Sequence, residues 1–329
     1  MKRVSLGVVG LGYWGPNLAR NVESIRGAQL SWCCDADAHA RDRLAPSFKD
    51  TRFTSSLDEL LADPELDGVL LATPVRTHAE LAVRVLEAGK HCFVEKPLAL
   101  SVAEAEGVVE AARTAGRVLM VGHLLEYHPG VRRLAEIVRA GELGTVHYIY
   151  TNRLNLGQLR ADENALWSLG AHDVSVVLAL AGDEPYELDA RGECYMRAGI
   201  EDVVFAYLRF RSGLTAQLHL SWLDPHKERR LTVVGSRRMA TFDDMELERK
   251  LTIYDKGFDE SAESWGEYIT RSGDATSPRI PNAEPLRLEC EHFVDCISSG
   301  ETPRSDGESG LRVVRVLEGL QAALDSSRR

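Results

Sequence analysis

Residues 4–15 have the sequence VSLGVVGLGYWG, an apolar run that leads directly into the glycines Gly10, Gly12 and Gly15. The run predicts a buried strand, and Pro16 predicts the first turn of a helix because its fixed φ suits that position. A strand, a GxGxxG turn and a helix in this order are typical of a dinucleotide-binding corner. We therefore expect an amino-terminal Rossmann domain, with a doubly wound parallel sheet.

The three glycines have separate tasks in such a corner. The first permits the tight turn, the second lets the backbone approach a pyrophosphate, and the third allows close packing of the helix, whose N-terminus stabilises the anion. Asp35 ends the second expected strand, twenty residues after Gly15, where an acid binds the adenosine ribose. A carboxylate repels a 2'-phosphate, and Arg41 and Arg43 come too late to bind one, so the sequence predicts NAD over NADP.

The first 122 residues alternate apolar runs with helical patterns, which predicts an α/β domain. Capping boxes mark three helix starts, with Ser56 before Glu59, Thr77 before Glu80 and Ser101 before Glu104. We expect an NAD-binding domain over residues 1–122. Its expected strands are Val4–Val9, Ala28–Cys34, Gly68–Ala72, His91–Glu95 and Val118–Gly122.

Residues 123–329 predict an α+β domain with a large open, mainly antiparallel sheet, for substrate binding and oligomerisation. Long strands follow one another through short turns such as Arg211-Ser-Gly213. The polar stretch Asp255–Asn282 is interpreted as a loop. Expected strands are Thr145–Asn155, Glu201–Arg211, Leu214–Trp222, Arg229–Val234 and Lys250–Tyr254, and expected helices are Val131–Ala140, Gly170–Ala181, Glu284–Ser298 and Asp306–Asp325.

Composition excludes several classes of protein. The 329 residues are 44% hydrophobic and 27% charged, an ordinary globular composition, and the formal net charge of -11 argues against a nucleic-acid surface. No apolar stretch approaches the roughly 20 residues needed to span a bilayer, so we expect no membrane association and a cytoplasmic protein. The six cysteines form no CxxC pair and are interpreted as buried thiols. His123, His128 and His172 lack metal-ligand spacing, which predicts no metal site.

Five motifs, in order, extend the pattern along the chain. They are GVVGLGYWG at 7–15, ATPVRTH at 72–78, EKP at 95–97, VGHLLEYHP at 121–129 and LWSLGAHDVS at 166–175. With these motifs the sequence resembles the glucose-fructose oxidoreductase / inositol 2-dehydrogenase family (Gfo/Idh/MocA) over essentially its whole length. The resemblance implies an NAD-dependent oxidoreductase whose active site lies between a Rossmann domain and an open-sheet domain.

The resemblance also implies the site residues. Lys96 and His172 are the implied catalytic residues. The implied cofactor-binding residues are Gly10, Gly12, Tyr13, Trp14, Gly15, Asp35, Thr73, Pro74, His78, Glu95 and Lys96. Those implied for the substrate are Lys96, His123, Arg153, Asn155, Arg160, Asn164, Trp167 and His172.

Residue chemistry agrees with the two catalytic positions. Lys96 follows a strand at its carboxyl end, where doubly wound sheets bind ligands. His172 precedes a helix with apolar residues at Val174, Val177, Leu178 and Ala181, so we expect it near a helix N-terminus. A positive helix end and the ammonium of Lys96 would both keep the imidazole neutral and able to accept a proton, and Lys96 would stabilise a developing alkoxide. The choice of formal base between the two stays open.

Two positions depart from the family pattern. The family often has Asp four residues before the histidine, where this chain has Ser168, and Asp173 could instead join a proton relay, cap the helix or form an ion pair. The arginine of the family's G-H-x-x-R-Y-x-P stretch is Glu126 here. This exchange alters the charge beside the expected pocket and weakens the analogy with the substrate of the inositol dehydrogenases.

The segment from Asn152 to Trp167 is expected to line the substrate pocket, and it also carries Asp162 and Glu163. Arg153 and Arg160 offer forks for phosphate, and Asn155 or Asn164 could bind sugar hydroxyls or an acetamido group. These motifs look like the branch of the family that oxidises nucleotide-activated amino sugars at C3. The resemblance thus implies UDP-N-acetylglucosamine or its uronic acid as substrate, and a 3-keto sugar for transamination.

Two other functions remain open on the sequence. One is a reductase of a keto-deoxysugar nucleotide, since the fold does not set the direction of hydride transfer. The other is a non-enzymatic NAD-binding regulator, against which the presence of both Lys96 and His172 argues. An open sheet with one uncovered face predicts a homodimer or homotetramer.

Overall fold

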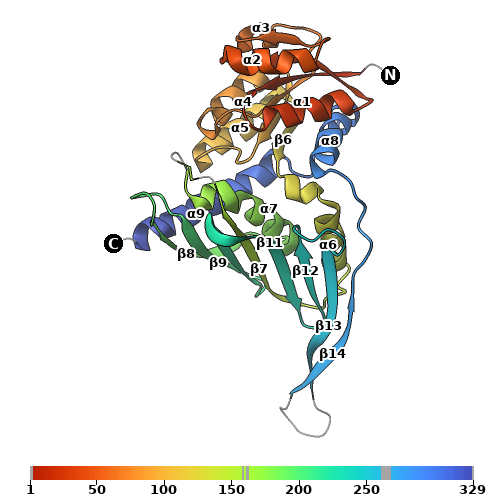
Figure 1. Ribbon diagram of the computed structural model, residues 1–329, viewed down its shortest axis with the longest axis vertical. Coiled ribbons are helices and arrows are strands. Elements are labelled where there is room, and N and C mark those ends of the chain that lie inside the picture. The colour runs from red at the N-terminus through yellow and green to blue at the C-terminus, as the bar shows by residue number, and fades with distance from the viewer. Residues whose placement is uncertain (1–2, 158, 161–162, 261–267, 328–329) are drawn as a thin grey trace. The chain divides into compact units, whose positions relative to one another are not determined.

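The computed structural model describes residues 3–157, 159–160, 163–260 and 268–327. The chain forms two compact units, coloured along the chain in Figure 1. Unit 1 comprises residues 1–127 and 283–315, and unit 2 comprises residues 128–282 and 316–329. The sequence predicted two consecutive domains divided after residue 122. The structure differs, because the chain returns to unit 1 after completing the sheet of unit 2.

Unit 1 contains a six-stranded sheet in the order β3-β2-β1-β4-β5-β6, and every pair of neighbouring strands is parallel. This order, with strands added on both sides of β1, is that of a doubly wound Rossmann fold and confirms the predicted fold class. The strands are β1 Val4–Val9, β2 Ala28–Cys34, β3 Arg52–Thr54, β4 Gly68–Leu71, β5 His91–Glu95 and β6 Leu119–Gly122.

Helices cover both faces of this sheet (Figure 1). They are α1 Gly15–Ser24, α2 Ala38–Leu44, α3 Leu57–Leu61, α4 His78–Glu87, α5 Val102–Ala115, α8 Pro285–Ser299 and the first part of α9 Gly307–Ser327, with 3₁₀ turns η1 Ala45–Ser47, η2 Val75–Thr77 and η3 Leu124–Tyr127. Helix α8 joins unit 1 because Leu286, Cys290 and Phe293 enter the core with residues of β1, β2 and α1. The rings of Phe93 and Phe293 meet edge to face at 5.9 Å.

Two of the three expected serine or threonine caps are present. The hydroxyls of Ser56 and Ser101 accept hydrogen bonds from the amides of Glu59 and Glu104, which is the serine half of a capping box. The expectation for Thr77 is wrong. Its hydroxyl donates to the carbonyl oxygen of Pro74 at 2.8 Å, because the 3₁₀ turn η2 precedes α4 and places the side chain against the turn.

Unit 2 contains an eight-stranded sheet in the order β14-β13-β12-β11-β7-β10-β9-β8. Only the pairing of β7 with β10 is parallel among these neighbours, which confirms the mainly antiparallel sheet. The strands are β7 Val146–Leu156, β8 Pro185–Glu193, β9 Val203–Phe210, β10 Thr215–Ser221, β11 Leu223–Gly235, β12 Met239–Asp243, β13 Leu251–Glu260 and β14 Tyr268–Thr276.

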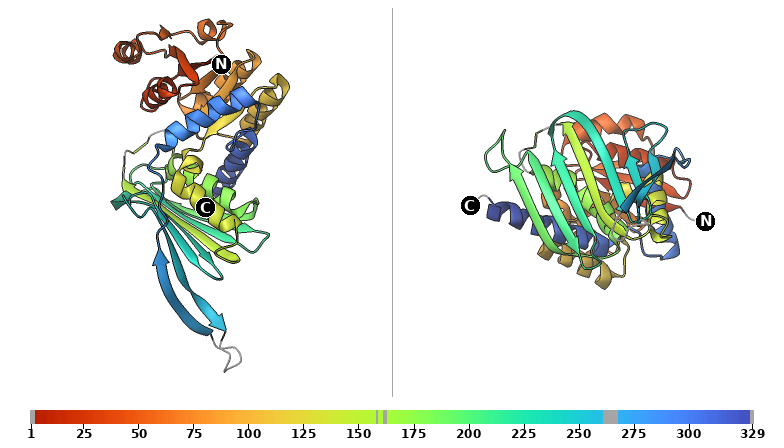
Figure 2. Two further views of the ribbon diagram at one scale, coloured as in Figure 1. Left: turned by 90° about the vertical axis from the view of Figure 1, so that its right-hand side faces the viewer. Right: turned by 90° about the horizontal axis from the view of Figure 1, so that it is seen from below.

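The sheet of unit 2 has one covered and one open face (Figure 2). Helices α6 Pro129–Arg139 and α7 Ala171–Ala181 pack on the covered face. Along β9 the side chains alternate accordingly: Val204 and Leu208 are buried, whereas Phe205 and Arg209 are exposed. No helix among the described residues of unit 2 lies over the open face in either view of Figure 2.

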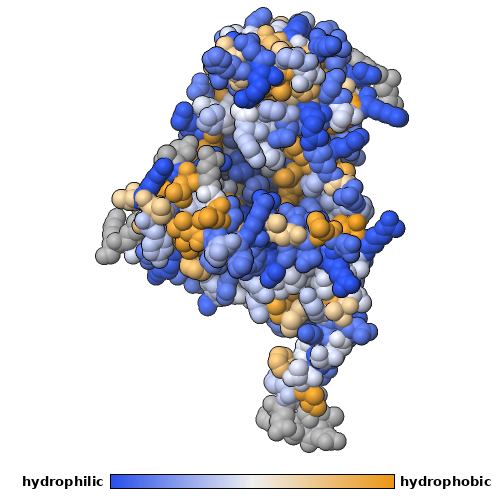
Figure 3. Space-filling view, viewed as in Figure 1, coloured by the Kyte–Doolittle hydropathy of each residue, from blue (hydrophilic) through white to orange (hydrophobic). Residues whose placement is uncertain are grey.

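The carboxyl-terminal strands of unit 2 correct the sequence prediction. Asp255–Asn282 was expected to be a loop, but β13 continues to Glu260 and pairs with β14. The pairing runs from Ile253 opposite Thr276 to Glu260 opposite Tyr268. Strands β8 and β12 were also not predicted. The ribbon of β13 and β14 extends beyond the other strands (Figures 1 and 2), and apolar side chains lie on its surface (Figure 3). Because nearly all of β14 is exposed, its sequence lacks the apolar alternation that marks a half-buried strand.

Two further expectations concern membranes and thiols. Within the described ranges, the model contains no helix with the length and apolarity required to cross a bilayer. The six cysteines are thiols rather than disulfides, and five of them are buried, as expected for small apolar side chains.

Candidate functional site

The glycine turn at the start of unit 1 has the geometry that the sequence predicted. Gly10 has a φ of +90°, and a Cβ there would lie 2.6 Å from the carbonyl oxygen of Ala72. A Cβ at Gly15 would lie 1.8 Å from the carbonyl oxygen of Gly10, so the helix can approach the turn only through a glycine. A Cβ at Gly12 would meet no protein atom within 4 Å. The space beside Gly12 is therefore open to a ligand.

A cavity of about 960 Å³ opens at this turn, at the carboxyl ends of β1, β2 and β4. Six expected cofactor residues line it: Gly10, Gly12, Tyr13, Asp35, Thr73 and Pro74. The lining also includes residues that the sequence analysis did not single out, among them Asp37, Arg43, Ser55, Leu57 and Arg76. A dinucleotide binds at this edge of a doubly wound sheet, so the cavity fits the adenosine half of NAD.

The carboxylate of Asp35 is held by two backbone amides. One oxygen accepts from Leu11 N at 2.6 Å and the other from Asp37 N at 2.8 Å. Each carboxylate oxygen has two lone pairs, so both can still accept from a ribose diol. The first bond also ties the end of β2 to the glycine turn, which places the acid at the cavity wall.

Arg43 does not lie where the sequence analysis expected. It was considered too late in the chain to bind a 2'-phosphate, yet it lines the cavity and donates to Leu11 O at 3.1 Å. Helix α2 turns back over the end of β2, and this turn brings Arg43 to the same residue that Asp35 contacts. Arg41 instead donates to the carbonyl oxygen of Asp35.

The EKP motif lies at the end of β5. Glu95 is buried and accepts from the backbone amide of Lys96 at 3.3 Å. Burial raises the pKa of Glu95 to about 7, while the Lys96 charge and hydrogen bonds from Lys96 N and the Trp14 side chain oppose this rise. A Cβ at Gly122 would lie 3.1 Å from Oε2 of Glu95, so β6 leaves room for the acid. The peptide bond between Lys96 and Pro97 is cis.

His78 and His123 are both buried near Lys96 in unit 1. The ring of His78 bridges two loops, with Nδ1 2.8 Å from Pro97 O and Nε2 2.8 Å from Thr73 O, and it is absent from the cavity lining. Burial, with a further contribution from the Lys96 charge, lowers the pKa of His123 to about 3. A neutral His123 therefore lies within electrostatic range of Lys96.

Glu126 and Glu289 form a buried acidic cluster with Glu95, which the sequence analysis missed. Burial raises the pKa of Glu126 to about 8, although Arg304 and Arg312 oppose the rise. Glu289 is fully buried, and within the described residues neither carboxylate oxygen has a hydrogen-bond partner. Burial, followed by repulsion from Glu95 and Glu126, raises its pKa well above the ordinary value.

A sequence signal for Glu289 existed. Leu286, Glu289, Cys290 and Phe293 occupy positions i, i+3, i+4 and i+7, so the acid lies within the apolar stripe of α8. A carboxyl on such a stripe is buried with its neighbours and must be neutral or paired.

In unit 2, His172 is the second residue of α7, in the first turn of the helix that the sequence predicted. A π-helical turn, η4 Leu166–Gly170, leads without a break into α7, and Oδ1 of Asn164 caps the segment by accepting from Trp167 N at 3.1 Å. Helical backbone therefore begins more than one turn before His172. Because the effect of a helix dipole falls off within the first turn, the preceding π turn weakens the dipole argument for His172. Single π turns are frequent at functional sites.

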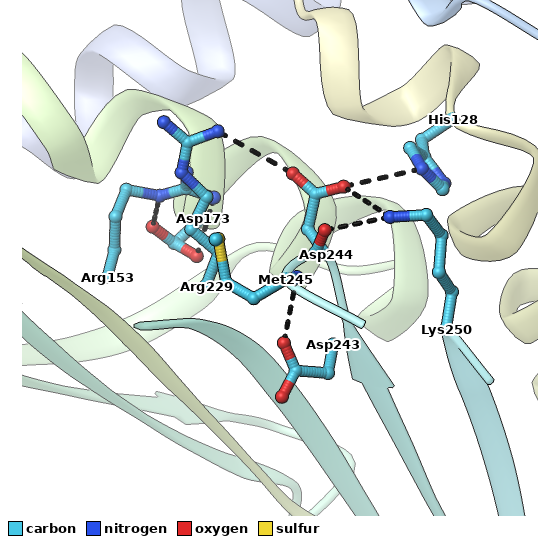
Figure 4. A network of polar contacts seen from close by, with 8 residues as sticks. All are labelled: His128, Arg153, Asp173, Arg229, Asp243, Asp244, Met245 and Lys250. Carbon is cyan, nitrogen blue, oxygen red and sulfur yellow. Dashed lines mark hydrogen bonds and ion pairs between the residues drawn. The ribbon is translucent and has the colours of Figure 1, made fainter. Parts of the chain in front are cut away.

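Asp173, the residue that follows His172, forms a buried ion pair with Arg153 (Figure 4). Nε of Arg153 donates to one carboxylate oxygen at 2.5 Å, and Nη2 lies 3.4 Å from the other. Arg153 was expected to bind phosphate. The structure instead engages its guanidinium with Asp173, joining β7 to the first turn of α7.

The other expected substrate residues lie in different surroundings. Asn164 is buried, and its amide donates to Glu201 at 2.7 Å and to Gln321 at 2.9 Å. Trp167 is also buried, and its indole donates to the same Gln321 side chain at 3.2 Å. Arg160 remains half-exposed, with Nε 3.1 Å from Glu163, and Asn155 is partly exposed on β7. Asp162 lies outside the described residues.

A second polar network surrounds Asp244 in unit 2 (Figure 4). The Asp244 carboxylate lies 3.4 Å from Lys250 Nζ, 3.5 Å from His128 Nε2 and 3.6 Å from Arg229. The pKa of His128 is lowered, mainly by burial. The negative charge of Asp244 opposes this change, and the positive charge of Lys250 adds to it. No group of His, Cys, Asp and Glu with the arrangement of a metal site occurs in the part of the chain that the structure describes.

Models of one protein family match both units of the chain. The model described as "Oxidoreductase family, NAD-binding Rossmann fold" matches residues 4–123, and the "GFO/IDH/MocA C-terminal domain" matches residues 131–241. The chain belongs to the Gfo/Idh/MocA oxidoreductase family. Its cofactor is NAD, and the cavity beside Gly12 and Asp35 fits the adenosine half of that molecule.

Relatives in this family are similar along the whole chain. The UDP-N-acetylglucosamine 3-dehydrogenase of Acidithiobacillus ferrooxidans is 28% identical, covering 99% of each chain, and its solved structure has a TM-score of 0.85 at 27% identity with full coverage of both. The myo-inositol 2-dehydrogenase of Thermotoga maritima is 25% identical, over 98% of this chain and 97% of its own. GenD2 from gentamicin A biosynthesis, solved with NAD, has a TM-score of 0.83 at 26% identity, covering all of this chain and 96% of its own.

The family assignment makes this chain an NAD-dependent dehydrogenase. When bound, NAD accepts or donates the hydride. The cavity beside Gly12 and Asp35 would hold its adenosine half, and Lys96 lies at the end of β5 in the same unit. The two departures from the family pattern have structural consequences: Ser168 lies in the π turn, and Glu126 is buried against α8 rather than exposed beside the cavity.

Proposed function

We propose that this protein oxidises a nucleotide-activated amino sugar at C3 with NAD⁺. The best candidate is UDP-N-acetylglucosamine or its uronic acid, giving a 3-keto sugar that a later transamination converts to an amine. The observation that carries the proposal is the full-length similarity to a UDP-N-acetylglucosamine 3-dehydrogenase. The NAD cavity and the presence of Lys96 and His172 support it.

The chemistry requires a group that takes the hydroxyl proton and a group that stabilises the oxygen. We assign these tasks to Lys96 and His172. An ammonium at Lys96 stabilises an alkoxide while the hydride leaves the same carbon, and a neutral imidazole at His172 accepts the proton. His123 supports this division, because a buried neutral imidazole adds no second positive charge beside Lys96.

The test is an assay of the purified protein with NAD⁺ and a panel of UDP-sugars that includes UDP-N-acetylglucosamine and its uronic acid. NADH is followed by absorbance, with an aminotransferase and glutamate present to remove the keto product. NADH formation with one sugar, absent in Lys96→Ala, is the expected result. No NADH with any sugar, from protein that binds NAD, would contradict the proposal and favour the keto-sugar reductase. A protein that also fails to reduce would be a regulator.

We also infer that the protein assembles as a homodimer or homotetramer, in the cytoplasm, through the open face of the unit 2 sheet. Neighbouring strands bring Tyr207, Gln217, Tyr150 and Thr232 into one row across this face. Arg209 and Glu187, which lie 3.6 Å apart on neighbouring strands, give the sheet exposed charges of both signs, and a twofold interface would bring two copies of this face together. Sedimentation equilibrium would test the inference, and a monomeric mass at micromolar concentration would contradict it.

A further inference from the structure

A short loop of unit 2, residues 194–200 between β8 and β9, presents large apolar side chains to solvent. Tyr195 is 68% exposed and Met196 55% exposed. Leu156, at the end of β7, is 78% exposed. Apolar side chains also gather among hydrophilic ones on the surface over this end of unit 2 (Figure 3). Exposed apolar side chains that form a contiguous patch mark a binding surface, whereas single ones need no explanation.

The backbone of the loop is hydrogen-bonded to a buried carboxylate. Asp202 is 1% exposed, and one of its carboxylate oxygens accepts from the amides of Tyr195 and Met196 at 2.7 and 2.8 Å. The other accepts from the indole of Trp222 at 2.7 Å. A buried carboxylate with three donors holds its partners firmly, since each charge-assisted bond is stronger than a neutral one. The backbone that carries the exposed side chains of Tyr195 and Met196 is therefore fixed.

One arginine of this loop, Arg197, contacts the backbone of a second arginine, Arg160. Arg197 Nη1 donates to the carbonyl oxygen of Arg160 at 3.0 Å, which links the loop to the segment after β7. Glu163 contacts Arg160 through Nε, and the two terminal nitrogens of that guanidinium carry four further N–H groups. Arginine forks suit phosphate oxygens, and this pair stands out in a chain with a formal net charge of -11.

The loop is connected to the helix that carries His172. The amide of Ala165 donates to Glu201 O at 2.9 Å, and the side chains of Asn164 and Glu201 are 2.7 Å apart. At a rise of about 1.5 Å per residue, His172 lies on the order of 10 Å along the helix from Ala165. A sugar ring and a diphosphate together span a distance of this order.

We propose that residues 194–200 and Arg160 bind the nucleoside diphosphate of the substrate, with the base stacked on Tyr195 and the phosphates bound by Arg160 and Arg197. This inference rests on the proposed function, because it names the part of a nucleotide sugar that this surface recognises. Stacking on tyrosine accepts any base, so the site recognises nucleoside diphosphates as a class.

Calorimetric titration of the full chain with UDP and with inorganic pyrophosphate, without NAD or turnover, tests the subsite directly. Tyr195→Ala should weaken UDP about tenfold and leave pyrophosphate unchanged, because stacking contributes about that factor per base. Arg197→Met should weaken both ligands. The matched control is Tyr186→Ala, which removes a 53% exposed tyrosine near Arg211 at the opposite end of β8. This control should bind both ligands as the wild type does.

Steady-state kinetics separates this inference from the proposed function. In the loop variants the KM for the UDP-sugar should rise with kcat little changed, because the contacts persist from ground state to transition state. Wild-type turnover of a UDP-sugar with unaltered KM and UDP affinity in Tyr195→Ala and Arg197→Met would overturn the subsite alone. A wild type that neither binds UDP nor oxidises any UDP-sugar would overturn both. Loss of affinity accompanied by a change of oligomeric mass would identify the loop as an interface and also overturn the subsite.

Discussion

Removing the carboxylate of Asp173 tests how unit 2 holds His172 in place. Asp173 is 4% exposed and Arg153 9% exposed, so Asp173→Ala leaves a buried guanidinium without its partner. Breaking a buried ion pair in this way costs about 3–5 kcal/mol, more than replacing both partners. Arg153→Met should cost a similar amount, because it leaves the carboxylate buried alone. The double variant Arg153→Met/Asp173→Ala should be less destabilised than the sum of the two single variants.

The assay is a double-mutant cycle on unfolding by urea at pH 7, followed by fluorescence and by circular dichroism. Coincidence of the two transitions is required before free energies are compared, because a chain with two units can unfold in steps. Arg230→Met is a control, since it removes an arginine whose side chain is 45% exposed and which pairs with Asp243 on the same sheet. A surface pair of this kind contributes about 0–1 kcal/mol.

The same variants report on His172. Loss of the ion pair loosens the first turn of α7, so kcat should fall in Asp173→Ala even under conditions where that variant is fully folded. The variant Asp173→Asn keeps one acceptor for Arg153 and should recover part of kcat. A coupling energy near zero would refute the reasoning, as would wild-type kcat in folded Asp173→Ala.

Three other predictions concern catalysis, cofactor choice and pH. Lys96→Ala and His172→Ala should each lower kcat about a hundredfold or more and leave the Kd for NADH unchanged; near wild-type turnover in both would refute their assignment. Asp35→Ser should lower kcat/KM for NAD⁺ by about 10–100-fold, the value of hydrogen bonds to a charged acceptor, and should raise it for NADP⁺; an unchanged ratio of the two would contradict the role of the acid. The native pKa of about 8 for Glu126 exceeds the ordinary value of 4.5, so between these two pH values the native state binds more protons than the unfolded state. The free energy of unfolding therefore decreases as the pH rises through this range, by up to about 1.4 kcal/mol per pH unit. Melting temperatures should therefore be lower at pH 8.5 than at pH 6, and Glu126→Gln or Glu289→Gln should reduce this dependence; an equal slope in all three proteins would show that these acids do not titrate there.

The sequence predicted unit 1 well because its strands are buried on both faces. The strands β1, β2 and β5 appear in the sequence as nearly unbroken apolar runs, and their observed bounds match the expected ones. The short strand β3 escaped detection, since three residues give no pattern. In unit 2 the strands β8 and β14 face solvent along much of their length, so polar residues conceal them.

The polar residues of the site were harder to assign than the fold. Arg153 and Asn164 have the side chains of ligand-binding residues, yet their partners are Asp173, Glu201 and Gln321, which are distant in the sequence. A sequence shows the donors but not the burial that decides whether a ligand or the protein satisfies them. The prediction for Arg43 was wrong in the opposite direction, because α2 turns back over the end of β2 and brings this arginine to the cavity wall.

The departures from the family pattern concern where a carboxylate can act. Ser168 removes the acid that often precedes the histidine, and the next acid in the sequence, Asp173, is engaged by Arg153. No carboxylate within this stretch of α7 and η4 is then available to take a proton from His172. Unit 1 differs, because Glu95 lies next to Lys96 and has a pKa of about 7. Its ionisation changes the field at Lys96 within the physiological range, so a pH profile of kcat that shifts in Glu95→Gln would trace proton handling to the EKP motif rather than to the helix of His172.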